Sequence, residues 1–443
     1  MEKVIVVGAG LVGSLQAILL AKKGFEVEVY ERRPDMRQVK LQGGKSINLA
    51  LSTRGWKALK MADVDQRINA ISIPMYARKM HAVDGTLTEQ QYGKEGQAIY
   101  SVPRGELNKQ LLLEASKYEN VSFFFNHKCL DVDLKSKTAT FQDKEGNVVT
   151  TAKARIFGTD GAFSAVRNRM MRTDRFDYSQ TYLKHGYKEL LLPANEDGSH
   201  KLSANHLHIW PRGEYMLIAL PNLDGSYTCT LFFPYDGKYS FNSLKTGQEV
   251  KDFFKEVFPD FYEMMPDVDE EYFQNPTSSL CIIRCEPWNF DDQIMLMGDS
   301  AHAIVPFYGQ GMNSGFEDCA VFAEMLEEYG DDWEGLFRDF AKLRKPDGDA
   351  IADLALQNYI EMRDLVGDPM FLLRKKIENR IYDKHPDKWM PLYSQVTFSH
   401  IRYSEALATG KKQDKIMAEV MKTPSIETLW DSEEIESKIL SQL

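Results

Sequence analysis

Residues 298–313 carry the most informative chemistry of the chain. This segment reads GDSAH at 298–302 and PFYGQGMN at 306–313. An apolar run at 294–297 leads into Asp299, and helix-forming residues extend from 316 to 326. A strand that ends in a carboxylate can hold a ligand, and the N-terminus of a helix attracts negative charge. The spacing therefore predicts a strand, a glycine-rich loop and a helix that together bind a ligand with an anionic part.

A second glycine-rich turn lies near the N-terminus, where Gly8, Gly10 and Gly13 follow an apolar run at 3–7. Helical spacing over 14–23 and an apolar run at 26–30 complete a β-α-β unit that ends at Glu31. Glycines at this spacing let the backbone approach a pyrophosphate, and the acid accepts hydrogen bonds from ribose hydroxyls. The unit predicts a dinucleotide site, which could hold either FAD or NAD.

Asp160 distinguishes these two cofactors when it is combined with Asp299. It follows an apolar run at 155–157, within the sequence GTDG at 158–161. Two acids at strand ends exceed what a nicotinamide cofactor requires, whereas the ribityl chain of a flavin offers several hydroxyls. Taken singly, Asp160 could be a turn residue and Asp299 a helix N-cap. Together with the N-terminal motif they favour FAD.

The remaining patterns outline the other parts of the fold. Predicted strands joined by short gaps lie at 130–134, 138–141, 148–149, 205–210, 215–220 and 227–233. The last three form antiparallel hairpins in a separate sheet, and helical spacing dominates beyond residue 320. We expect an α/β fold with a Rossmann-like dinucleotide-binding domain, a substrate domain with an antiparallel sheet, and a C-terminal helical region.

Composition limits the function classes. The 443 residues suffice for two or three domains, and 54 Lys and Arg against 65 Asp and Glu give a net charge of −11, which argues against nucleic acid as a partner. Five cysteines lack the spacing of zinc or redox motifs, so we expect reduced thiols and no metal site. No signal peptide and no apolar stretch of about 18 residues is visible, so we expect a cytoplasmic protein without a membrane anchor.

Three segments, 8–13 with Glu31, 158–161 and 298–313, resemble the fingerprints of the single-component FAD aromatic hydroxylases. Further segments resemble the kynurenine 3-monooxygenase family within that group, and they lie at 45–52, 74–78, 101–104, 208–212, 358–363 and 396–398. The resemblance implies a fold of the para-hydroxybenzoate hydroxylase type. We expect an FAD-binding domain at 1–70, 98–175 and 281–335, a substrate domain at 71–97 and 176–280, and a helical region at 336–443.

By position, the resemblance implies a tightly but non-covalently bound FAD. The residues implied for it are Gly8, Gly10, Val12, Gly13, Tyr30, Glu31, Arg32, Arg33, Ala50, Arg104, Cys129, Asp160, Asp299, Gly311, Met312 and Asn313. Residues 30–33 would lie along the adenosine, and Asp160 and Asp299 would hold the adenine and ribityl portions. The N–H groups of Met312 and Asn313 would face the N1–C2 edge of the flavin.

The resemblance also implies a substrate site for L-kynurenine. Its residues would be Arg78 and Tyr92 for the α-carboxylate, Asn358 and Tyr393 for the rest of the polar pocket, and Pro306 and Phe307 for the aromatic ring. An arginine suits a carboxylate because its guanidinium donates two parallel hydrogen bonds. From the residues alone, Arg78 could equally be a surface arginine, Tyr92 a turn residue, and Asn358 and Tyr393 ordinary core residues.

The implied reaction is hydroxylation of L-kynurenine to 3-hydroxy-L-kynurenine, in tryptophan catabolism, through a C4a-hydroperoxyflavin. It consumes O2 and a transiently bound NADPH. No catalytic side chain is expected, because the aniline nitrogen already activates the ring, and His302 would hold its loop.

Alternatives are a flavin hydroxylase of another aromatic or a polyprenyl ring, and a non-catalytic FAD-fold carrier. The chain lacks the C-terminal anchor of eukaryotic members, and Tyr76 stands where an arginine is expected in animal enzymes. The lack of an anchor suggests a soluble bacterial form, for which a homodimer is left open.

Overall fold

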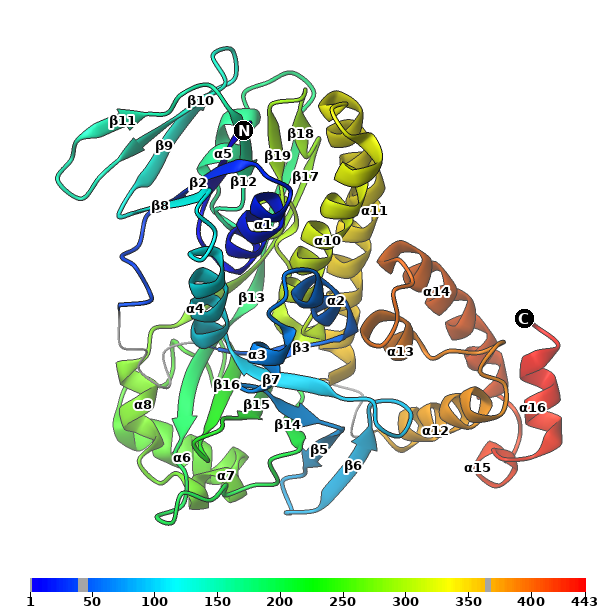
Figure 1. Cartoon of the computed structure of the whole chain (residues 1–443). Coiled ribbons are helices and arrows are strands. Elements are labelled where there is room, and N and C mark those ends of the chain that lie inside the picture. Colours follow the sequence, from blue (N-terminus) through cyan, green and yellow to red (C-terminus); the bar gives the residue numbers. More distant parts are fainter. Residues whose placement is uncertain (1, 39–46, 363–367) are drawn as a thin grey trace.

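The computed structural model describes residues 2–38, 47–362 and 368–443 (Figure 1). One sheet of six strands has the spatial order β18 (Asn289–Phe290), β19 (Ile294–Leu296), β12 (Arg155–Gly158), β1 (Lys3–Val7), β2 (Glu26–Glu31) and β8 (Val121–Phe125). All neighbours pair in parallel except β18 and β19. The carboxyl ends of parallel strands share one edge of a sheet, so Gly8, Glu31, Asp160 and Asp299, at or just beyond four of these ends, converge there.

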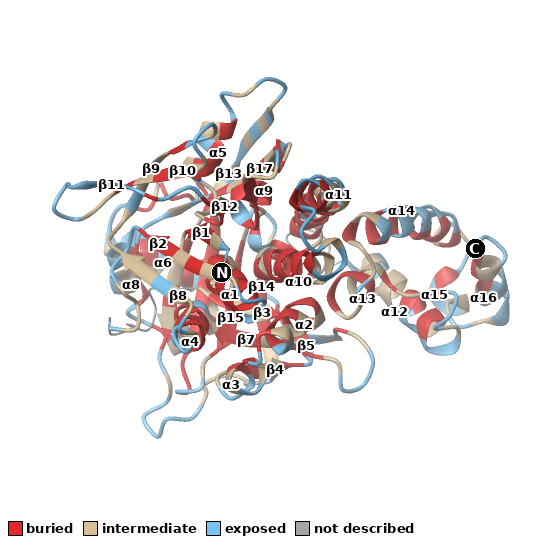
Figure 2. Cartoon of the chain, turned by 45° about the horizontal axis from the view of Figure 1, so that its top comes forward, coloured by how far each residue is buried: buried red, intermediate tan, exposed pale blue. Residues whose placement is uncertain are grey.

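Helices cover the six-stranded sheet and bury its apolar strands. The main ones are α1 (Leu11–Lys22), α4 (Arg104–Ala115), α10 (Gly311–Tyr329) and α11 (Trp333–Ile360). Helix α1 packs against α4 and α10, and Figure 2 shows β1, β12 and α10 among the buried parts of the chain. The predicted β-α-β unit and its parallel strands are confirmed.

Helix α10 begins at Gly311, within the stretch that the sequence predicts to be a loop. A Cβ atom on Gly315 would lie 2.6 Å from Cγ2 of Val12. Gly315 therefore permits close packing of α10 against the first turn of α1. The low helix propensity of glycine predicts a loop at this point. In the structure, however, glycine stands in a helix because two elements pack closely there.

Two small sheets flank the central one. The predicted meander is confirmed as β9 (Lys128–Asp133), β10 (Thr138–Gln142) and β11 (Val148–Thr150), which pair antiparallel. The other sheet contains β3 (Asn48–Leu51), β7 (Ile99–Pro103) and β4 (Ile73–Met75). Helix α2 (Thr53–Met61) follows β3 and packs on α10, and α3 (Asp65–Asn69) follows α2.

A second large sheet has seven strands. Their spatial order is β17 (Ser278–Glu286), β13 (Asp177–Leu192), β16 (Tyr227–Pro234), β15 (Tyr215–Pro221), β14 (His206–Arg212), β5 (Ala77–His81) and β6 (Leu87–Gln91). The predicted hairpins β14–β15–β16 are antiparallel, whereas β5 pairs with β14 in parallel. The division into domains stays a prediction. Strand β17 crosses the predicted boundary at residue 281.

One face of the seven-stranded sheet is covered by α6 (Gly247–Val257), α7 (Pro259–Met264) and α8 (Val268–Gln274), through an aromatic core. A buried polar cluster lies on this face. Nδ1 of His81 lies 2.7 Å from the carboxylate of Asp260, and its Nε2 lies 2.9 Å from Nδ1 of His208. Trp210 donates its Nε1 hydrogen to Asp260, so the cluster connects β5, β14 and α7.

This cluster predicts acid-sensitive stability. Burial lowers the pKa of His208 to about 3, from a usual value near 6.5. Below pH 6.5, His208 binds a proton in the unfolded chain but stays neutral in the folded chain. The free energy of unfolding should therefore fall as pH drops from 6.5 towards 3. The slope from this group is up to about 1.4 kcal/mol per pH unit. Urea unfolding of wild type and His208→Gln should show a shallower decline in the variant, and equal slopes would contradict the prediction.

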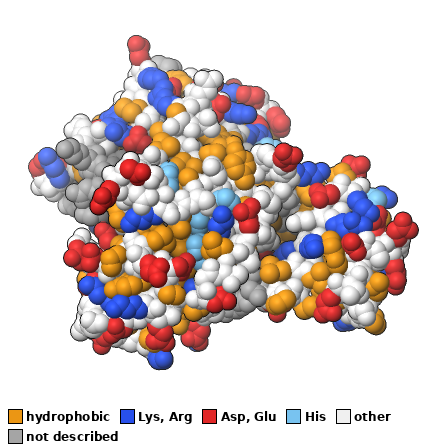
Figure 3. Space-filling model, turned by 90° about the horizontal axis from the view of Figure 1, so that it is seen from below, with side chains coloured by type: hydrophobic (Ala, Val, Ile, Leu, Met, Phe, Trp, Pro, Cys, Tyr) orange, Lys and Arg blue, Asp and Glu red, His pale blue; other side chains and the backbone are white. Residues whose placement is uncertain are grey.

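The last helices pack around a core of their own, which includes Ile381, Trp389 and Met417. They are α12 (Pro369–Lys384), α13 (Leu392–Thr397), α14 (Tyr403–Val420), α15 (Ile426–Leu429) and α16 (Glu433–Leu440). They extend to one side of the sheets in Figure 1. Among the described residues, no helix has both the length and the apolar character needed to cross a bilayer. Acidic and basic side chains are interspersed on the face shown in Figure 3.

Candidate functional site

A continuous cavity of about 610 Å³ runs from the carboxyl edge of the six-stranded sheet to the face of the seven-stranded sheet opposite α6, α7 and α8. The predicted residues that line it are Gly8, Gly10, Val12, Tyr30, Glu31, Arg32, Arg33, Ala50, Arg78, Tyr92, Arg104, Cys129, Asp160, Asp299, Pro306, Phe307, Gly311, Met312 and Tyr393. The tertiary structure therefore brings both predicted sites into one enclosure.

The turn after β1 forms one end of this cavity. Gly8 has φ of +100°, a conformation that favours glycine. The carboxylate of Glu31 accepts hydrogen bonds from the backbone N–H groups of Ala9 and Arg33, each at 2.9 Å. Burial opposes ionisation of Glu31, but the hydrogen bonds from Arg33 and Ala9 lower its pKa below the usual value. An ionised acid at this point can accept hydrogen bonds from ribose hydroxyls.

Two further acids reach the middle of the cavity. Asp160 accepts a hydrogen bond from the backbone N–H of Ala165 at 2.7 Å, at the start of α5 (Ala165–Met170). Its second oxygen is buried and has no hydrogen-bond partner among the described residues, and burial raises the pKa of this carboxyl. Asp299 begins α9 (Asp299–His302), and its side chain makes no hydrogen bond within the described part of the chain. A polyhydroxylated ligand would supply the partner that the buried oxygen of Asp160 lacks, and it could also donate to the exposed carboxylate of Asp299.

The first turn of α10 faces the same cavity through Gly311 and Met312. The N–H groups of a first helical turn have no partner inside the helix, so they are available to an anionic ligand atom. Asn313 has a different position: its side chain donates to the carbonyls of Ala50 and Gly309, each at 2.8 Å, and accepts from Ser52 N–H at 2.9 Å. Asn313 thus ties β3 and α2 to the loop before α10.

His302 is buried and hydrogen-bonded away from the cavity, as expected of a residue that holds the loop. Its Nε2 lies 2.6 Å from Asp318, and its ring stacks on Trp288 at 4.9 Å. Asp318 also accepts from Gly298 N–H at 3.0 Å and from Arg344 at 2.9 Å. Burial opposes the charge of Asp318, but His302 and Arg344 lower its pKa. The buried charges fix the backbone just before Asp299.

The far end of the cavity contains a buried cation. Arg78, on β5, is 5% exposed, and its guanidinium lies 4.8 Å from the ring of Tyr393 and 5.3 Å from that of Tyr92. Burial opposes its charge, but Tyr393, Tyr92 and Glu361 raise its pKa, so it stays protonated. The hydroxyl of Tyr92 is buried without a hydrogen-bond partner among the described residues. These groups form a ready site for a carboxylate.

Apolar side chains form the neighbouring wall. Phe307, in the 3-10 turn Pro306–Tyr308, stacks on Tyr359 at 4.0 Å and approaches Phe232 of β16 at 4.7 Å. Alternate residues of β14, β15 and β16 line the same space, and they are Leu207, Met216, Ile218, Leu220, Thr230 and Phe232. A planar aromatic group fits such a wall.

Some predicted residues lie outside the cavity lining. Gly13 packs closely on Gly8, and Asn358 donates its amide to the carbonyl of Phe307 at 2.6 Å. Asn358 thus supports the wall from behind, and its role as a direct ligand stays a prediction. Lys45, Ser46 and Arg363, members of the motifs above, lie outside the described residues.

Two residues near Arg78 were not predicted from the sequence. Glu361, just beyond α11, lies 3.9 Å from the guanidinium, and Tyr308 stacks on Tyr393 at 5.5 Å. Glu361 belongs to the segment 358–363 and Tyr308 to the segment 298–313. Both segments were already assigned to the site, so these residues could have been included. Their proximity to Arg78 depends on packing between distant segments.

Comparisons with known proteins agree with this geometry. Residues 1–334 match the family model described as an FAD binding domain. The kynurenine 3-monooxygenase of Flavobacterium johnsoniae is 52% identical over 442 residues, covering 100% of this chain and 98% of the relative. That of Sus scrofa is 42% identical over 414 residues, covering 93% of this chain and 87% of the relative.

Solved structures show the same fold. The tetrameric form of 2-methyl-3-hydroxypyridine-5-carboxylic acid oxygenase superposes with a TM-score of 0.68 at 17% identity, covering 86% of this chain and 97% of that one. Pseudomonas aeruginosa PqsL in complex with 2-aminobenzoylacetate gives 0.63 at 16% identity, covering 82% and 97%. At these identities the likeness concerns the fold alone.

Proposed function

The chain belongs to the kynurenine 3-monooxygenase family of FAD-binding proteins, and we propose that it hydroxylates L-kynurenine to 3-hydroxy-L-kynurenine with NADPH and O2. The observation that carries this proposal is the position of Arg78. This buried cation shares one cavity with the residues that we propose to hold the dinucleotide. L-kynurenine has an amino-acid end and an aromatic ring, and the cavity offers a charged end and an apolar wall.

The amino-acid end would meet groups of both charges. Arg78 suits the α-carboxylate because a guanidinium binds it with two parallel hydrogen bonds, and the free hydroxyl of Tyr92 adds a third donor. Glu361 lies beside Arg78 and supplies negative charge for the α-ammonium. A buried ion pair needs this full set of partners to offset desolvation.

The cofactor half fits FAD. Glu31 would bind the ribose, the unpaired oxygen of Asp160 and the side chain of Asp299 would bind hydroxyls, and the first turn of α10 would stabilise negative charge at the flavin N1–C2 edge. When bound, FAD supplies the redox chemistry that places one atom of O2 on the ring. The chain's own residues position the ring and exclude water. The aniline nitrogen activates the ring, so no side-chain base is required.

The location of the enzyme in the cell and its oligomeric state are inferred from the sequence. We propose a cytoplasmic enzyme, because all five cysteines are free thiols. A homodimer stays an expectation from the sequence.

The test follows NADPH oxidation by the purified flavoprotein with and without L-kynurenine, with mass analysis of the product. We expect oxidation to accelerate with L-kynurenine and the product to gain one oxygen atom. Anthranilate is the matched control, because it keeps the aniline and a carboxylate but lacks the amino-acid chain. Faster turnover of anthranilate would favour a different aromatic substrate, and no NADPH oxidation with any aromatic would favour a carrier.

A further inference from the structure

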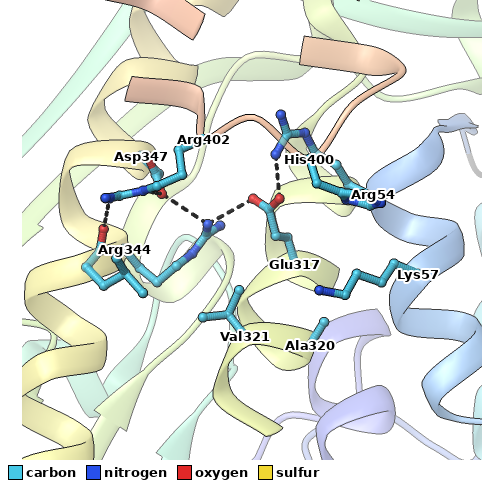
Figure 4. Close-up of a pocket in the computed structure, with 10 residues that line it drawn as sticks. Arg54, Lys57, Glu317, Ala320, Val321, Arg344, Asp347, His400 and Arg402 are labelled. Carbon is cyan, nitrogen blue, oxygen red and sulfur yellow. Dashed lines mark hydrogen bonds and ion pairs between the residues drawn. The ribbon is translucent and has the colours of Figure 1, made fainter. Parts of the chain in front are cut away.

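Arg54 connects the cofactor half of the molecule to the substrate half. It is the second residue of α2, and its side chain is fully buried. A crevice of about 110 Å³ lies beside it, between α2, α10, α11 and residues 400–402. Figure 4 shows Arg54 paired with Glu317, which also pairs with Arg344. Glu317 precedes Asp318, so Arg54 belongs to the buried charge network that fixes the backbone just before Asp299.

The same guanidinium holds the end of α13. Its Nε donates to the carbonyl of Val396 at 2.8 Å, and its Nη2 donates to the carbonyls of Gln395, at 3.3 Å, and Ile401. The ring of Tyr403 lies 4.0 Å from the guanidinium carbon. The last carbonyls of a helix lack partners inside it, and a cation there is favourable. Arg54 thus caps α13 from another part of the fold.

Helix α13 carries Tyr393, which faces Arg78 in the cavity. The ring of Tyr393 is stacked between Tyr92 and Tyr308, so its placement depends on where α13 lies. The carbonyls that Arg54 holds lie two and three residues further along the same short helix. A shift of this helix would move the Tyr393 ring away from the carboxylate site.

The surroundings of Arg54 also contact the start of α10. Ser52 N–H and Gly55 both contact the side chain of Asn313, so the first turn of α2 is fixed against α10. The hydroxyl of Tyr403, which packs on Arg54, donates to Gln310 at 2.9 Å. Arg54 therefore lies between α13, which carries Tyr393, and the start of α10. The distance between these two elements determines how the substrate ring would lie relative to the flavin.

We propose that Arg54 is a positioning residue that sets the substrate pocket relative to the flavin by holding α13, and so Tyr393, on α2. It lies outside the cavity lining, so its effect on either ligand would be indirect. The proposal rests on the proposed function for its substrate, and its structural part is independent of that substrate. Misplaced α13 should weaken L-kynurenine binding and let reduced flavin react with oxygen unproductively.

The test uses the full-length holoenzyme with Arg54→Met combined with Glu317→Gln, so that the buried positive charge is removed together with the carboxylate that pairs with it. We expect full FAD content, a KM and a Kd for L-kynurenine raised about tenfold, more peroxide per NADPH, and a kcat changed less than about threefold. Arg54→Lys should recover part of the affinity. Arg402→Gln is the matched control, because Arg402 pairs with Asp347 in the same crevice but does not hold α13.

A Kd within about twofold of wild type in the double variant, or an equal rise in Arg402→Gln, would overturn the proposal. Hydrogen exchange of the substrate-free holoenzyme separates this outcome from failure of the proposed function. Amides of residues 393–399 should exchange faster in the double variant than in wild type, and unchanged exchange would contradict the role of Arg54. Absence of L-kynurenine turnover in wild type would instead refute the substrate assignment.

Discussion

Arg78→Met is expected to lower kcat/KM for L-kynurenine by about 10²-fold or more, because loss of one member of a buried charge pair costs about 2–5 kcal/mol. Arg78 is the buried cation of the cavity, so the substrate carboxylate would lose water without gaining a partner. Methionine keeps much of the side-chain volume, and Lys375, 3.5 Å from Glu361, keeps that carboxylate paired. Steady-state kinetics, with substrate Kd from the flavin spectrum, measures the effect.

Two variants make this result specific. Lys79→Met removes a positive charge from the next residue of β5, which sits near Ser203 and outside the cavity lining, and should leave kcat/KM near the wild-type value. Arg78→Lys keeps the charge but loses the planar fork, so we expect an intermediate loss. If Arg78→Met keeps kcat/KM within about threefold of wild type, Arg78 does not bind the substrate carboxylate.

Asp299→Ala should weaken FAD binding by about 10²-fold, because a carboxylate that accepts two hydrogen bonds contributes about 1.5–3 kcal/mol through each. Asp299 lines the cavity and makes no side-chain hydrogen bond within the described part of the chain. Removal of this side chain should therefore delete contacts to the ligand, and it should delete no hydrogen bond that stabilises the fold. Titration of the apoprotein with FAD gives the affinity, and the flavin-to-protein absorbance ratio after gel filtration gives the retained cofactor.

The control for this loss is Asp383→Ala, an equal charge change at an exposed position of α12. Its FAD affinity should equal that of wild type. Asp299→Asn keeps one acceptor oxygen, so it should lie between wild type and the alanine variant. Full FAD retention in Asp299→Ala would remove Asp299 from the cofactor site, and a large drop in apoprotein stability would show a structural role instead.

The cofactor half was largely predictable from the residues. Gly8, Glu31, Asp160 and Asp299 each follow an apolar run that becomes a parallel strand, and such strands end at one edge of a sheet. Local patterns therefore imply that these residues meet. The expected start of the helix at residue 316 was too late, since α10 begins at Gly311 and includes Gly315, whose close contact with Val12 requires glycine.

The sequence alone determined a dinucleotide-binding β-α-β unit, a flavin-like set of acids and the hairpin sheet, because each depends on short-range periodicity and spacing. Only the tertiary structure decided that Arg78 is a buried cation, that Glu361 and Tyr308 lie beside its pocket, and that Asn358 supports Phe307 from behind. The physical reason is that burial of a charge and its partners depends on packing between segments far apart in the chain. The segment 298–313 touches both halves of the cavity, yet its role at the substrate end emerges only when β16 and α11 pack against Phe307.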